Sequence, residues 1–127
     1  MAKKVKLLEE YYSQFPEWYW TRGLHDAEII SFKQMSLSTD WKSKNPRYNC
    51  LEICFNSSGA MTKLKRIEFY NYSLKMEFDI NTIEKPWWMG DNLTRLADGR
   101  FLLDITVEDA KGKKHFFSVS FEDIEVE

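Results

Sequence analysis

The chain has 127 residues, which is enough for one domain with a substantial core and too few for two domains of usual size. Its 18 lysines and arginines against 20 aspartates and glutamates give a net charge of −2, which argues against a general attraction to nucleic acid or anionic lipid. We therefore expect a single domain over residues 1–127, with no nucleic-acid partner and no membrane partner.

The location of the protein can also be inferred from its sequence. No stretch approaches the roughly 20 apolar residues of a membrane-spanning helix, and the basic N-terminus reaches Glu9 before any apolar run typical of a signal peptide. Cys50 and Cys54 lie in one strand-like run, too far apart along a strand to form a disulfide. We expect a cytoplasmic protein with two free thiols.

The first element predicted along the chain is a helix over residues 2–15. Apolar side chains recur there at three- and four-residue steps from Val5 to Phe15, and Pro16 follows. This spacing is typical of an amphipathic helix with one face packed against a larger element.

Alternation of apolar and polar residues then replaces the helical spacing and predicts about six strands. The predicted strands are 29–37, 50–55, 66–70, 74–80, 101–107 and 117–121. A change of parity in the first strand predicts a β-bulge near Lys33 or Gln34. The alternation stops between residues 81 and 99, so Pro86–Gly90 is predicted to be an apolar loop that covers the sheet or lines a site. We expect an α+β fold, with the N-terminal amphipathic helix packed on a mainly antiparallel, strongly curved sheet.

The sequence offers few candidates for catalysis or cofactor binding. None of the five glycines begins a phosphate-binding loop, and the two cysteines lack the spacing of a zinc site. We therefore expect no cofactor, no metal site and no enzymatic activity. The adjacent His25 and Asp26 could exchange protons, but a structural role in hydrogen bonding nearby backbone is favoured.

Two further groups are candidate binding residues. Trp87 and Trp88 could form an aromatic platform for a ligand, although sealing of the sheet by buried indoles is favoured. Near the C-terminus, Glu122, Asp123 and Glu125 form an acidic edge. Such carboxylates could meet a basic protein partner, although charged residues are also common at exposed strand ends.

The segment GLHDAEI at residues 23–29 follows the aromatic triplet of residues 18–20 and precedes the alternating strands. This layout resembles small bacterial immunity-type proteins encoded beside polymorphic toxins, and related domains with a His-Asp motif. The resemblance implies an α+β fold and a non-catalytic role, in which the protein neutralises a toxin domain by direct binding.

Three functional hypotheses follow from the sequence. The first is a non-enzymatic intracellular protein-binding domain, with contacts at Trp87, Trp88 and the acidic edge. The second is a small-ligand-binding protein or hydrolase with a site at His25, Asp26 and the tryptophans. The third is a structural role, such as a homodimer formed through an exposed strand edge, so the chain is expected to be a monomer or a homodimer.

Overall fold

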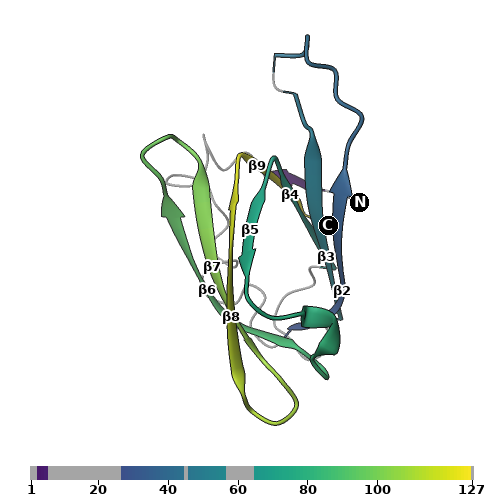
Figure 1. Ribbon diagram of the computed structural model, residues 1–127, viewed down its shortest axis with the longest axis vertical. Coiled ribbons are helices and arrows are strands. Elements are labelled where there is room, and N and C mark those ends of the chain that lie inside the picture. The colour runs from purple at the N-terminus through teal and green to yellow at the C-terminus, as the bar shows by residue number, and fades with distance from the viewer. Residues whose placement is uncertain (1–2, 6–26, 45, 57–64, 127) are drawn as a thin grey trace.

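The computed structural model describes residues 3–5, 27–44, 46–56 and 65–126, which form a single antiparallel sheet (Figure 1). Within these residues the sheet has nine strands and one short 3-10 helix. The elements are β1 (Lys3–Val5), β2 (Ala27–Ser36), β3 (Asn49–Asn56), β4 (Arg66–Tyr70), β5 (Ser73–Met76), η1 (Ile80–Thr82), β6 (Trp87–Arg95), β7 (Phe101–Glu108), β8 (Lys114–Phe121) and β9 (Asp123–Val126).

Most of the sheet is formed by two three-stranded meanders that face each other (Figure 1). Strands β2, β3 and β4 are consecutive neighbours in one meander, and β6, β7 and β8 are consecutive neighbours in the other. The meanders meet directly through one short pairing, in which Ala27 and Glu28 of β2 lie opposite Trp88 and Trp87 of β6. The sheet is therefore folded over on itself.

Two pairs of strands connect the meanders at the opposite corner. Strand β4 pairs with β9, and β5 pairs with β8. Only Asn71 and Tyr72 separate β4 from β5, and only Glu122 separates β8 from β9. Each of these two chain segments thus bends from one half of the sheet to the other, which is how strands turn the corner between packed sheet layers.

The core fills the space between the two halves. Successive side chains of a strand point to opposite faces, so alternate residues of each strand face inward. The fully buried large side chains are Leu51, Ile53, Ile67, Phe69, Trp88, Phe101, Leu103, Ile105, Phe121 and Ile124. Aromatic rings from different strands meet inside, such as Phe69 and Phe121 at 4.9 Å between ring centroids.

The predicted α+β class is wrong, although the sheet is antiparallel as expected. Residues 3–5 of the predicted N-terminal helix form β1, which pairs with β9, while residues 6–15 lie outside the described part of the chain. Strand β1 places its three residues opposite Ile124–Val126, so backbone pairing at the sheet edge overrides the helical spacing.

Three further details differ from the sequence-based expectations. The bulge in β2 is at Ile30, which is 59% exposed, and not near Lys33 or Gln34. The segment predicted as an apolar loop at Pro86–Gly90 is largely the start of strand β6. The predicted strand 74–80 ends at Met76, and the side chain of Asp79 accepts a hydrogen bond from the backbone of Asn81 at the start of η1.

Candidate functional site

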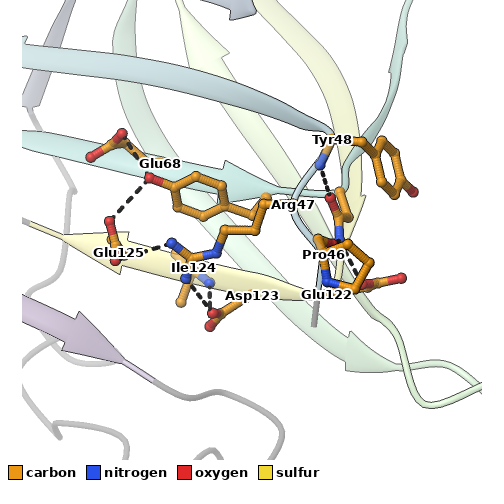
Figure 2. Close-up of polar contacts among 10 residues, drawn as sticks. Pro46, Arg47, Tyr48, Glu68, Glu122, Asp123, Ile124 and Glu125 are labelled. Carbon is orange, nitrogen blue, oxygen red and sulfur yellow. Dashed lines mark hydrogen bonds and ion pairs between the residues drawn. The ribbon is translucent and has the colours of Figure 1, made fainter. Parts of the chain in front are cut away.

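The acidic edge predicted at the end of the chain lies beside an arginine from a distant segment (Figure 2). Arg47 precedes β3, and its Nη2 lies 2.6 Å from Oδ2 of Asp123. Its Nη1 lies 3.3 Å from Oε1 of Glu125. Two of the three predicted acidic residues therefore share an ion pair with Arg47 within the protein.

Tyr70 of β4 completes this group. The guanidinium carbon of Arg47 lies 3.9 Å from the centroid of the Tyr70 ring, in a cation–π contact. The Tyr70 hydroxyl lies 3.0 Å from Oε2 of Glu68 and 3.0 Å from Oε2 of Glu125 (Figure 2). We refer to Arg47, Glu68, Tyr70, Asp123 and Glu125 as the Arg47 cluster.

The protonation of the Arg47 cluster follows from its surroundings. Burial alone lowers the pKa of Arg47, but Asp123 and Glu125 outweigh burial, so the pKa is raised and the guanidinium stays charged. Burial, followed by the contacts with Glu68 and Glu125, raises the pKa of Tyr70. The hydroxyl therefore keeps its proton, and because it has only one, it donates fully to one carboxylate at a time.

Cys50 lies on β3 opposite Tyr70 and is also shielded. Burial, followed by the charges of Glu68 and Glu52, raises its pKa to about 12. Both Cys50 and Cys54 are free thiols. A thiol with this pKa carries almost no thiolate at neutral pH, so Cys50 is poorly suited to nucleophilic chemistry.

Asn71 anchors the segment before β3 to the corner of the sheet. Its Oδ1 accepts a hydrogen bond from the backbone N–H of Tyr48 at 2.9 Å, and its Nδ2 donates to the carbonyl of Pro46 at 2.8 Å. Nδ2 also lies 2.8 Å from Oε2 of Glu122, whose other oxygen lies 3.2 Å from Nη1 of Arg100. The third predicted acidic residue is therefore also held by intramolecular contacts.

The connection from β2 to β3 carries two exposed aromatic side chains. Trp41 is 69% exposed and stacks on Tyr48, with ring centroids 5.8 Å apart and planes 18° apart. We refer to Trp41 and Tyr48 as the aromatic tip. Hydrogen bonds hold its backbone, since Leu37 N donates to the carbonyl of Tyr48 at 2.9 Å and Thr39 Oγ1 donates to that of Arg47 at 2.8 Å.

The two predicted tryptophans have different environments. Trp88 is fully buried in the core, where its Nε1 donates to Oδ2 of Asp91 at 2.8 Å. Trp87, the preceding residue of β6, is 45% exposed and lines a cavity beside the β7–β8 turn. Only Trp87 of this pair is accessible to a ligand or partner.

The structure also contains a His-Asp pair that sequence reasoning missed. Nε2 of His115 lies 3.1 Å from Oδ2 of Asp109 across the β7–β8 turn, and hydrogen bonds from His115 and from the backbone of Lys113 lower the pKa of Asp109. The sequence does contain a signal for this pair, because Asp109 begins a predicted hairpin turn and His115 follows the turn. His25 and Asp26 lie outside the described residues.

Two kinds of feature are absent from the described residues. No group of three or more His, Cys, Asp or Glu residues in this part of the chain is arranged to hold a metal ion. Across the same residues, no helix has the length and apolar character needed to cross a membrane.

Comparisons of the chain with protein-family models, with curated proteins and with solved structures gave no match.

Proposed function

We propose that this chain is a non-enzymatic protein-binding domain that contacts its partner through the aromatic tip. The observation that carries the proposal is the stacked Trp41–Tyr48 pair, which is exposed on a hydrogen-bonded connection. Tryptophan and tyrosine dominate the binding energy of protein interfaces, and rigid positioning reduces the entropy lost on association.

The charges beside the aromatic tip indicate the chemistry of the partner. Lys42 and Lys44 are exposed and form no ion pair with the residues that the structure describes. An apolar pocket bordered by carboxylates would accept the indole of Trp41 and complement both lysines. The proposed partner surface is therefore acidic and apolar.

In this proposal, the acidic edge has a supporting role. Glu122 contacts Asn71, while Asp123 and Glu125 contact Arg47, and both of these residues lie at the base of the aromatic tip. Truncation of any of the three carboxylates would then weaken partner binding by loosening the tip. The cytoplasmic location belongs to the same proposal, and two free thiols support it.

The test begins with capture of proteins from a lysate of the natural source, using immobilised wild-type chain, Trp41→Ala and Trp87→Ala. A protein held by the wild type and by Trp87→Ala but not by Trp41→Ala is then purified for affinity measurement. We expect Trp41→Ala to weaken its binding about 30-fold, which corresponds to a hot spot of about 2 kcal/mol. The double variant Lys42→Glu/Lys44→Glu should also weaken binding, and the loss of affinity should be larger at low salt than at high salt.

Equal affinity of the wild type and Trp41→Ala would contradict the proposal, as would the absence of any protein held by the wild type. Self-association on size-exclusion chromatography that is lost in Trp87→Ala but retained in Trp41→Ala would instead favour a homodimer through another surface. The immunity-type role is a narrower form of the proposal, which requires that the purified partner be a toxin domain whose activity the chain suppresses.

A further inference from the structure

The β7–β8 turn lies at the opposite end of the molecule from the connection between β2 and β3 (Figure 1). Residues of this turn line a cavity beside Trp87. Its volume is about 440 Å³, within the range of small-molecule sites. We refer to it as the Trp87 cavity. It is lined by Lys85, Trp87, Glu108, Asp109, Ala110 and Gly112.

The lining combines the apolar indole of Trp87 with two carboxylates and one ammonium. Trp87 is 45% exposed, so part of its indole is open to the cavity. The carboxylate of Glu108 and the ammonium of Lys85 make no hydrogen bond or ion pair with any described residue. Asp109 differs, because Oδ1 accepts from the backbone of Lys111 and Lys113, each at 2.9 Å, and Oδ2 contacts His115. Glu108 and Lys85 therefore remain available to a ligand.

The backbone around the Trp87 cavity is fixed. Lys85 adopts a left-handed conformation with φ of 49°, which is unfavourable for a residue with a side chain. Hydrogen bonds hold the chain on both sides of it, from Ala110 N to the carbonyl of Glu84 at 3.1 Å and from Ile29 N to that of Pro86 at 2.8 Å. Trp87 and Glu108 lie opposite each other in the β6–β7 ladder. The cavity is thus formed before any ligand arrives.

The chemistry of the lining favours a neutral ligand rich in hydroxyl groups. Because Glu108 and Lys85 carry opposite charges, an ion that is attracted by one of them is repelled by the other. A hydroxyl group both donates and accepts, so neighbouring hydroxyls can donate to the carboxylate and accept from the ammonium. A flat apolar face is also needed to cover the exposed indole. A pyranose ring has both features, because its C–H groups form an apolar face and its hydroxyls lie around the rim.

We propose that the Trp87 cavity is a carbohydrate-binding site, in which a pyranose ring lies on the indole of Trp87 and its hydroxyls contact Glu108 and Lys85. This site is independent of the proposed protein-binding surface, since it shares no residue with the aromatic tip.

The test is titration of the ¹⁵N-labelled full chain with cellotetraose, xylotetraose, maltotetraose and chitotriose, followed through the indole N–H resonances. We expect at least one of these sugars to bind at millimolar or lower concentration and to shift the Trp87 resonance. Trp87→Ala should weaken that binding at least tenfold, and Glu108→Gln, which keeps the shape of the side chain but removes its charge, should weaken it several-fold. Trp41→Ala is the matched control and should bind the sugar like the wild type.

The proposal is overturned if none of the four sugars shifts the Trp87 resonance at its solubility limit. It is equally overturned if Trp87→Ala, folded as judged by its spectrum, binds the sugar with wild-type affinity. If Trp87→Ala does not fold, the test relies on Glu108→Gln. Sugar binding by Glu108→Gln with wild-type affinity would then overturn the proposal. Absence of sugar binding would not change the expected effect of Trp41→Ala on protein binding. The two proposals can therefore be contradicted independently.

Discussion

Asn71 shows how one residue determines the geometry at a corner of the sheet. Its φ of 54° lies in the left-handed region, which asparagine tolerates better than most residues. The side chain is 4% exposed and bonds Tyr48, Pro46 and Glu122. The backbone bend and the side-chain bonds therefore act at the same point, between β4 and β5.

Substitution of Asn71 separates these two contributions. We expect Asn71→Gly, which keeps the backbone conformation but loses the side-chain bonds, to lower the free energy of unfolding by about 3 kcal/mol. Asn71→Ala also brings a Cβ into the left-handed conformation and should cost about 1 kcal/mol more. Urea denaturation of both variants measures the difference. Equal stability of the two would show that the backbone conformation is not strained.

At the scale of an element, β6 contains neighbouring tryptophans with opposite environments. Trp88→Ala should lower the free energy of unfolding by about 4 kcal/mol, because it leaves a large cavity in the core. Trp87→Ala should cost less than about 1 kcal/mol, because nearly half of that side chain is exposed. Chemical denaturation of the two variants provides the comparison. Similar losses would contradict the inward orientation of Trp88.

The same strand contains Asp91, which accepts a hydrogen bond from Trp88 and is partly buried. Burial raises its pKa above 3.8, and the indole donor only partly opposes this shift. The folded chain therefore binds this proton more tightly than the unfolded chain, so the contribution of Asp91 to stability falls as pH rises from about 3.8 through the raised pKa. At neutral pH the charged carboxylate therefore stabilises the fold less than its protonated form does at low pH.

The substitution Asp91→Asn tests the predicted direction of this pH dependence. The amide oxygen can still accept from the indole of Trp88, while the buried charge is removed. We expect the variant to be more stable than the wild type at pH 7, and the advantage to shrink as pH falls through the raised pKa toward 3.8. Urea denaturation at several pH values measures both. Asp104→Asn, at an exposed position of β7, is the control, and lower stability of Asp91→Asn at pH 7 would contradict the prediction.

Comparison of β6 with β7 shows what the sequence could reveal. Strand β7 has an apolar residue at every second position from Phe101 to Val107, so its pattern predicts a strand directly. In β6 the register shifts between Trp88 and Gly90, and the next inward position is the polar Asp91. The bulge and the polar inward residue together interrupt the alternation of apolar and polar residues. The sequence of Pro86–Gly90 therefore predicts a loop instead of a strand.

The Arg47 cluster illustrates a second limit of prediction. The acidic edge was visible in the sequence, but Arg47 is separated from Asp123 and Glu125 by 76 and 78 residues. Only the pairing of β4 with both β3 and β9 brings β9 beside the segment that leads into β3. Local patterns predict the individual strands, whereas the pairing of charges depends on the complete topology.

At the scale of the whole molecule, the described pairings fall into two groups. Within each meander, neighbouring strands are also consecutive in sequence. The pairings outside the meanders, which include those that join the two meanders, connect distant segments, as between β2 and β6 and between β4 and β9. Closing a longer loop loses more chain entropy before its contacts are made, so the joining pairings should form last during folding.

Two core truncations of similar chemistry test this order. Leu103 lies in the β6–β7–β8 meander and Ile124 lies in β9, and both are fully buried, so each change to Ala should cost about 2–5 kcal/mol. We expect Ile124→Ala to act almost entirely by raising the unfolding rate, with a φ-value of about 0–0.3. Leu103→Ala should also slow folding, because its meander is already partly formed in the transition state. Stopped-flow chevrons measure both rates, and a larger φ-value for Ile124 than for Leu103 would mean that β9 docks before the meander forms.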